Sequence, residues 1–175
     1  MQAVGMEVLQ LVLLAILPAL VIVAGLKDLT SMKIPNWISG LLILGFFPAA
    51  LALGLQPATI GVHLGIAVAA LLVGMGLFAL NFLGGGDVKL MAAACLWLGL
   101  SGSGVFVLAT AVIGGLFSLA LLVSRAWLQP YIGAGPGWLV QLMEPKGHIP
   151  YGVAIAGGAL VAWPASPLML AFLAG

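Results

Sequence analysis

Long apolar stretches separated by short polar ones dominate this chain. Six apolar blocks can be delimited, at residues 8–26, 37–55, 58–82, 88–100, 105–123 and 151–173. Most of them match the roughly 20 residues that an α-helix needs to cross a bilayer. They are also too long and too uninterrupted for the helices of a soluble core. The pattern therefore predicts an all-α, polytopic membrane protein, a bundle of about six transmembrane helices.

Two segments depart from this regular pattern. The fourth block, residues 88–100, is short, so either its helix begins inside the preceding glycine run or the bilayer is thinner there, and a re-entrant segment is the competing interpretation. The longest polar connection, residues 124–150, is rich in Gly and Pro and contains Trp127, Tyr131 and Trp138. Aromatic side chains of this kind favour the membrane–water interface. We expect this connection to lie on the membrane surface.

Composition agrees with the hydrophobic pattern and removes several classes of partner. Hydrophobic residues make up 64% of the 175 residues and charged residues 5%, and the mean hydropathy is +1.32. A net charge of +1 gives no basic surface for nucleic acid and no acidic tail. Cys95 is the only cysteine, which excludes a disulfide within the chain and a paired-cysteine zinc site, and we expect it to be a small buried hydrophobic residue. The lipid bilayer is the expected surrounding.

The positive charges predict an orientation. With six crossings, every Lys and Arg falls on one side of the membrane. Five crossings would place at least one basic cluster on the other side. The charges therefore argue against a re-entrant segment at residues 88–100. Positive residues favour the cytoplasmic side. We therefore expect a protein of the cytoplasmic (inner) membrane whose N-terminus lies outside the cytoplasm and whose positively charged side faces the cytoplasm. The residues concerned are Lys27, Lys33, Lys89, Arg125 and Lys146.

The only two aspartates are the strongest candidates for chemistry. Asp28 follows the first block and Asp87 precedes the fourth, so both are predicted at the same, cytoplasmic, edge of the membrane. One such aspartate is typically only solvated, but two at matching depth favour a functional interpretation. Two neighbouring carboxyl groups tend to share one proton, so one can act as base and the other as acid when water attacks a peptide carbonyl. The pair could therefore divide the roles of acid and base, as in aspartic proteases generally.

The residues around the aspartates have weaker claims. Gly84, Gly85 and Gly86 would leave a narrow approach to Asp87 without side chains, and close helix packing is the alternative explanation. Pro35 is expected to begin the second helix, and Asn36 to hydrogen-bond the turn that orients Asp28. Lys89 could interact electrostatically with Asp87, bind a lipid phosphate, or serve only as a cytoplasmic anchor.

The histidines do not suggest a metal site. His63 lies within an apolar block and is expected to be a hydrogen-bonded interior residue. His148 is too far from it in sequence to make a convincing ligand pair. We therefore predict neither a metal nor a cofactor.

Three segments together resemble the type IV prepilin peptidases, members of the GxGD group of membrane aspartyl proteases. They are DLTSMKIPNW, GGGDVKL and HIPYGVAIAGG, in this order along the chain. The resemblance implies that Asp28 and Asp87 are catalytic and that Gly84 and Gly86 are the glycines of the motif. It also implies that Pro150 and Gly152 belong to the segment that opens the last helix.

The resemblance also implies a substrate and partners. The chain begins close to its first apolar block, without the cysteine-containing N-terminal methyltransferase segment of the larger members, and so resembles the short, peptidase-only form of Tad/Flp pilus systems. Residues 1–175 are then one transmembrane peptidase domain that removes the short leader of prepilins at the cytoplasmic face. The expected partners are a prepilin with a transmembrane N-terminal helix, and pilus-assembly machinery or a second copy. The alternatives are an archaeal-type preflagellin peptidase, an ion-coupled transporter and a structural subunit of a secretion machine.

Overall fold

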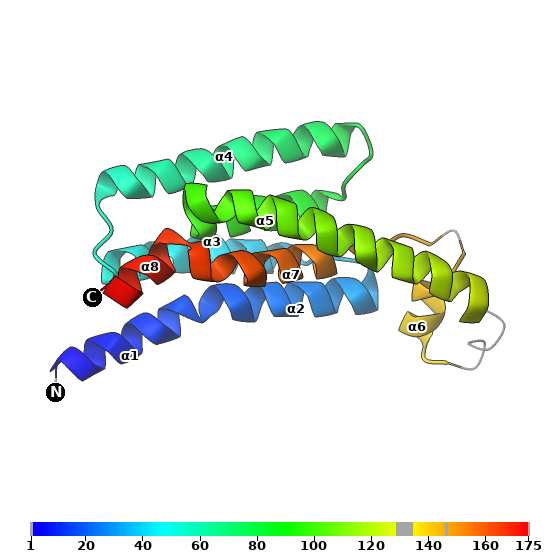
Figure 1. Ribbon diagram of the computed structural model, residues 1–175, viewed down its shortest axis with the longest axis horizontal. Helices are drawn as coiled ribbons and strands as arrows, with labels where there is room; N and C mark the ends of the chain where they lie inside the picture. Colours follow the sequence, from blue (N-terminus) through cyan, green and yellow to red (C-terminus); the bar gives the residue numbers. More distant parts are fainter. Residues whose placement is uncertain (1, 129–134, 146, 175) are drawn as a thin grey trace.

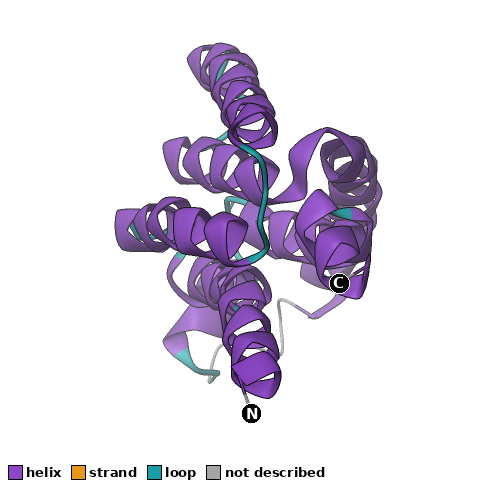
Figure 2. Cartoon of the chain, turned by 90° about the vertical axis from the view of Figure 1, so that its left-hand side faces the viewer, coloured by secondary structure: helices purple, strands orange, loops and turns teal. Residues whose placement is uncertain are grey.

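The protein is a bundle of α-helices. The computed structural model describes residues 2–128, 135–145 and 147–174, and no β-strand occurs among them (Figure 1). Viewed from the end that carries both termini, the helices pack side by side around a common interior (Figure 2). In chain order the elements are α1 (Gln2–Leu14), α2 (Ile16–Ser31), α3 (Asn36–Ala52), α4 (Pro57–Ala79), α5 (Gly85–Leu128), α6 (Gly137–Leu142), α7 (Tyr151–Ala162), the 3-10 helix η2 (Trp163–Ala165) and α8 (Pro167–Ala174).

Four helical stretches are long and apolar enough to cross a membrane. They are Val4–Ser31, Pro57–Ala79, Gly85–Trp127 and Tyr151–Ala174, and Asn36–Ala52 is a shorter apolar helix. Many large apolar side chains on these helices are exposed, which suits lipid and not water. The all-α, polytopic membrane fold predicted from the sequence is therefore confirmed.

Helix α5 reverses direction at Gly99. This residue has φ 60° and ψ −165°, outside the helical region, and divides α5 into a first leg (residues 85–98) and a second leg (residues 100–128). A Cβ at this position would lie 2.8 Å from Cε1 of His63 and 2.9 Å from Cγ of Pro167. Both the positive φ and the crowding therefore require glycine here.

The first leg of α5 packs antiparallel to α4. Val88, near its start, lies against Gly74 late in α4. Leu96, near its end, accepts a hydrogen bond of 2.6 Å from Nδ1 of His63, early in α4. His63 is thus a buried, hydrogen-bonded residue, as predicted, and it bonds a carbonyl of the last turn before the reversal, where carbonyls lack helical partners.

The second leg of α5 returns along α7. Ser101 donates a hydrogen bond of 3.0 Å to the carbonyl of Ala165, whereas Gly114 lies against Tyr151 at the start of α7. Figure 1 shows the two legs running in opposite directions. Counting α1 with α2 and α7 with α8, the described residues pass along the bundle six times, and the fourth and fifth predicted blocks are separate passes.

The interior is filled by aromatic and aliphatic side chains. Trp97, on the first leg of α5, is fully buried and donates its indole N–H to the carbonyl of Leu42 at 2.7 Å. Its ring packs edge-on against Phe46, with centroids 6.0 Å apart. Cys95 is 3% exposed and belongs to the same cluster, which includes residues of α1, α2, α3, α5, α7, η2 and α8. The prediction that Cys95 is a small buried residue is confirmed.

Polar residues gather at one end of the bundle, here called the aspartate end because it holds Asp28 and Asp87. The connections after α2 and before α5 lie there, together with the segment that precedes α7, whereas both termini lie at the opposite end (Figure 1). The predicted clustering of basic residues on one side holds for the four that the structure describes, and Lys146 lies outside the described residues. The four are Lys27, Lys33, Lys89 and Arg125.

The predicted surface connection is shorter than expected. Helix α5 continues through Arg125 to Leu128, and α6 lies within the connection. A polar residue marks where a helix leaves the apolar region, but it does not interrupt the backbone hydrogen bonds, so the helix extends past Ser124. Trp127 and Trp138 are exposed, and Tyr131 lies outside the described residues.

Candidate active site

Asp28 is held by the first turn of a helix that is distant in sequence. It lies in the last turn of α2 and is 6% exposed. Its Oδ2 accepts a hydrogen bond of 2.7 Å from the backbone N–H of Gly152, the second residue of α7. The first N–H groups of a helix have no partner within the helix, so they are free to bind a carboxylate. A Cβ on Gly152 would lie 2.8 Å from Cβ of Asp28, and glycine is therefore required for this contact.

Asp87 is held by the glycine run that precedes it. It lies in the first turn of α5 and is half-buried, and its Oδ2 accepts a hydrogen bond of 3.1 Å from the N–H of Gly84. A carboxylate three residues inside a helix that bonds the N-cap N–H is one half of a capping box. The local sequence thus gives Asp87 a fixed position without help from the rest of the fold.

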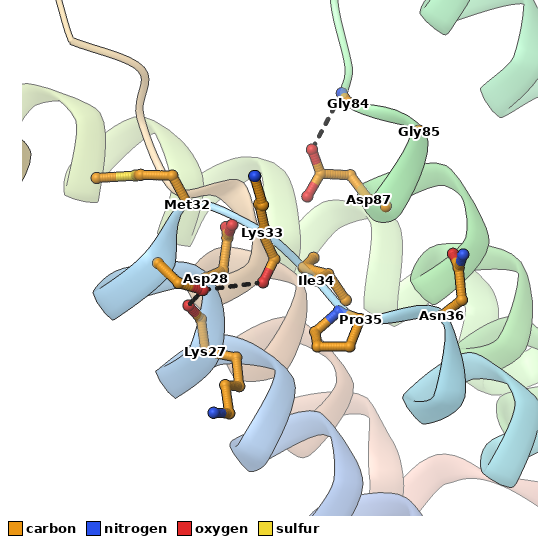
Figure 3. A pocket seen from close by; sticks show the side chains of 12 residues that line it. Lys27, Asp28, Met32, Lys33, Ile34, Pro35, Asn36, Gly84, Gly85 and Asp87 are labelled. Atoms are coloured by element: carbon orange, nitrogen blue, oxygen red, sulfur yellow. Dashed lines mark hydrogen bonds between the residues drawn. The ribbon is translucent and has the colours of Figure 1, made fainter.

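Asp28 and Asp87 project toward the same space. They line a cavity of about 610 Å³ between the α2–α3 connection and the glycine run, and Figure 3 shows the two carboxylates approaching each other from opposite walls. The other lining residues come from the end of α2, the α2–α3 connection, the start of α3 and the glycine run. They are Lys27, Ser31, Met32, Lys33, Ile34, Pro35, Asn36, Gly84, Gly85 and Gly86.

A second cavity adjoins the first. It has a volume of about 560 Å³ and shares Asp28, Met32, Gly84 and Asp87 with the first cavity. Its other walls are residues 81–83 and residues 147–151, which include Pro150. The carboxylates therefore have space on two sides, as is required when an extended chain passes across them.

The three glycines of the run are not equivalent. A Cβ on Gly84 would lie 2.9 Å from Oδ2 of Asp87, and a Cβ on Gly86 would lie 3.1 Å from Cβ of Ile34. A Cβ on Gly85 would meet only Phe78, at an ordinary 3.7 Å. Gly84 thus leaves space at the carboxylate, Gly86 permits close packing against the α2–α3 connection, and Gly85 does neither.

Pro35, Asn36 and Lys89 lie near the site, and the hydrogen bond of Lys89 goes to Asn36 and not to an aspartate. Pro35 precedes α3 as its N-cap and is not its first residue. Asn36 accepts a hydrogen bond of 2.9 Å from Nζ of Lys89, which joins the start of α3 to α5. The prediction that Asn36 bonds the turn after Asp28 is wrong, because that turn is closed by the N–H of Met32, which donates to the carbonyl of Asp28 at 2.8 Å.

Two residues at the site have a left-handed backbone that the sequence does not predict. Met32 (φ 52°) and Asn81 (φ 60°) are the non-glycine residues with positive φ in the described part of the chain, and both line the second cavity. Strained backbone of this kind is concentrated at functional sites. A Met or an Asn in a sequence does not by itself predict a positive φ, although Asn adopts a positive φ more often than most residue types.

From the sequence, Arg125 is predicted only to be one of the positive residues on the cytoplasmic side. Its guanidinium instead donates to the carbonyls of Leu142, Gly147 and His148, beside the second cavity. A lone arginine at the end of an apolar helix was the available signal. His148 contributes a backbone carbonyl to this contact and is not near His63.

The arrangement supplies two carboxyl groups to one cavity, each fixed by a glycine N–H. Paired carboxyls in such a site can divide the roles of acid and base. No group of three His, Cys, Asp or Glu side chains is placed to hold a metal ion in residues 2–128, 135–145 and 147–174. General acid–base chemistry is what two paired carboxyl groups can provide.

Comparison with known protein families identifies a match. Residues 15–119 match the sequence profile of the type IV leader peptidase family. This is more than half of the chain and includes both aspartates, the glycine run, Pro35, Asn36 and Lys89, whereas Pro150 and Gly152 lie beyond it. No curated protein and no solved structure matches the chain significantly.

Proposed function

The chain belongs to the type IV leader peptidase family, and we propose that it is an aspartic endopeptidase in which Asp28 and Asp87 are the catalytic pair. As a family member it is a peptidase, with the helices of a multi-pass membrane protein. The observation that carries the proposal is that two aspartates far apart in sequence line one cavity from opposite walls. Each also accepts a hydrogen bond from a glycine N–H.

The proposed reaction uses one proton shared by the two carboxyl groups. The ionised carboxyl takes a proton from water as the water oxygen bonds to the carbonyl carbon of the scissile peptide. The protonated carboxyl gives its proton to the carbonyl oxygen, and a tetrahedral diol results. As the C–N bond breaks, the diol returns a proton to the carboxyl that had protonated the carbonyl oxygen. The leaving nitrogen takes the proton held by the carboxyl that had deprotonated the water. The pair ends with one proton, as it began.

We propose that the substrate is the precursor of a Tad/Flp-type pilin. A substrate whose own hydrophobic helix lies in the bilayer would present its short polar leader at a membrane edge, and the aspartate end offers a site at such an edge. The basic residues gathered there support a cytoplasmic position in the inner membrane. A preflagellin would reach the site in the same way, so both precursors belong in the assay.

We also propose that residues 1–175 form a single peptidase domain. One cluster of buried side chains, with members in α1, α2, α3, α5, α7, η2 and α8, supports this. Pilus-assembly proteins or a second copy of the chain are the proposed partners. An ion-coupled transporter is less well supported, because transporters place ionisable groups near the membrane midplane, whereas Asp28 and Asp87 lie at one end of the bundle.

The decisive test is cleavage of a prepilin by purified protein, measured as a gel shift. Asp28→Asn and Asp87→Asn should each abolish cleavage without loss of folded protein, because an amide keeps the shape of the side chain but cannot share the proton. Glu7→Gln, the same acid-to-amide change in α1, near the opposite end of the bundle, is the matched control and should remain active.

Two results would contradict the proposal. An aspartate whose variant keeps about a tenth or more of the wild-type rate, a change of only about 1.4 kcal/mol in barrier, is not one of the catalytic pair. Absence of cleavage by the wild type, together with ion flux in liposomes that requires the aspartates, would favour the transporter.

A further inference from the structure

Arg125 holds the segment that leads into α7. It lies in the last turn of α5 and is 5% exposed. Its Nε donates to the carbonyl of Leu142, its Nη1 to that of Gly147 and its Nη2 to that of His148, each at 2.9 Å. All three partners are backbone carbonyls, so the guanidinium fixes the path of the main chain and not the position of a side chain.

This segment is part of the candidate active site. Residues 147–151 form one wall of the second cavity, beside Asp28 and Asp87. Four residues after His148, the N–H of Gly152 donates to Asp28 at 2.7 Å. Pro150 lies between them and restricts the backbone. Movement of the carbonyls that Arg125 binds would therefore move both the cavity wall and the donor to Asp28.

The contact requires an arginine. A guanidinium has donors in a rigid, planar fork and can satisfy three carbonyls at once, whereas a lysine ammonium is a point charge on a flexible chain. The Leu142 carbonyl, at the last residue of α6, also lacks a helical partner. Removal of the guanidinium would leave these buried or half-buried carbonyls unsatisfied, which is costly.

We infer that Arg125 is a positioning residue for the Asp28 and Asp87 site, acting through the main chain of residues 147–152. This inference rests on the proposed function. The guanidinium of Arg125 hydrogen-bonds the backbone of Leu142, Gly147 and His148 and not the aspartates, so its effect on the reaction is transmitted by the segment that it fixes.

The test compares Arg125→Gln and Arg125→Lys with Trp127→Leu, a control on the same helix end at a side chain that is 75% exposed. Cleavage of a prepilin is measured per folded molecule, together with hydrogen exchange of the amides in residues 147–152. Arg125→Gln should lower kcat/KM by about tenfold to a hundredfold, the scale of a small misplacement in an active site. It should also speed exchange in residues 147–152, including Gly152. Arg125→Lys should have a smaller effect of the same kind, and the control should match the wild type.

The possible failures can be told apart. If Arg125→Gln unfolds more easily but its folded molecules have wild-type kinetics and exchange, the role of Arg125 is only structural and the inference is wrong. Faster exchange with unchanged kinetics would also overturn it. If the wild type cuts neither prepilin nor preflagellin, the proposed function fails, and unchanged exchange in Arg125→Gln would then also refute the positioning of residues 147–152.

Discussion

At the scale of single residues, the candidate site depends on glycines, which have no side chain, beside the two aspartates. Gly84 and Gly152 each donate a backbone N–H to a catalytic candidate, and a Cβ on either would lie less than 3.0 Å from a carboxylate oxygen. The aspartates thus lie against bare main chain, which also leaves room for a substrate backbone. A larger residue in place of either glycine would displace the carboxylate that this glycine now orients.

The glycine run gives a graded prediction. Gly84→Ala and Gly86→Ala should lower cleavage strongly, because a Cβ would crowd Asp87 in the first case and Ile34 in the second. Gly85→Ala should remain active, since its Cβ would meet only Phe78 at 3.7 Å, and alanine favours the first turn of α5. The prepilin assay measures all three, and an inactive Gly85→Ala with an active Gly84→Ala would contradict this account.

Met32 gives a prediction about stability. Its left-handed backbone costs roughly 1–2 kcal/mol for a residue with a Cβ, and glycine is the preferred residue at this position after a helix. Met32→Gly should therefore raise the melting temperature in detergent. Because the side chain lines both cavities, the same change should alter cleavage. A lower melting temperature would mean that side-chain packing outweighs the backbone strain.

At the scale of elements, the reversal of α5 brings together the residues of the site. The first leg has Asp87 in its first turn and runs away from the aspartate end, and the second leg returns to this end with Arg125 in its last turn. The hydrogen bond from His63 to Leu96 holds the end of the first leg. Two passes thus supply the carboxylate and the guanidinium to the same end of the bundle.

Gly99 is the residue on which this reversal depends. Gly99→Ala should reduce the yield of folded protein, because its Cβ would clash with His63 and Pro167 in a backbone conformation that alanine adopts poorly. Gly115→Ala, on the second leg where a Cβ would meet nothing within 4 Å, is the control and should be neutral or stabilising by about 0.5–1 kcal/mol. Thermal unfolding in detergent measures both. Equal stability of the two variants would mean that the reversal tolerates a side chain.

At the scale of the whole molecule, the arrangement implies a single orientation. The described basic residues lie at the aspartate end, and the connection between α3 and α4 lies at the other. If the positive-inside rule governs insertion, the catalytic candidates face the cytoplasm and both termini lie outside.

Cysteine labelling in intact cells tests this orientation. Ser31→Cys, at the aspartate end, should react only after the membrane is made permeable, whereas Gln56→Cys, at the opposite end, should react from outside, since both positions are exposed. The native Cys95 is buried and should contribute little signal. The reverse pattern of labelling would place the site outside the cytoplasm and exclude the proposed delivery of the leader.

The sequence by itself determined which segments run along the bundle and which residues lie at each of its ends. The apolar blocks together with the one-sided positive charges predict six passes, and the polar residues between the blocks define the ends. This pattern alone assigns Asp28 and Asp87 to the same end. It also connects the glycine run with Asp87, because Gly84 and Asp87 are three residues apart and their contact is local.

Only the tertiary structure decided which residues meet across the bundle. In a membrane protein the faces toward lipid and toward the interior are both apolar, so periodicity gives little information on which helices are neighbours. The contacts between Gly152 and Asp28, Lys89 and Asn36, and Arg125 and His148 all join separate helices or segments. They depend on packing among passes that are alike in composition. Hydropathy fixes depth in the membrane, whereas packing fixes lateral position, and the candidate site requires both.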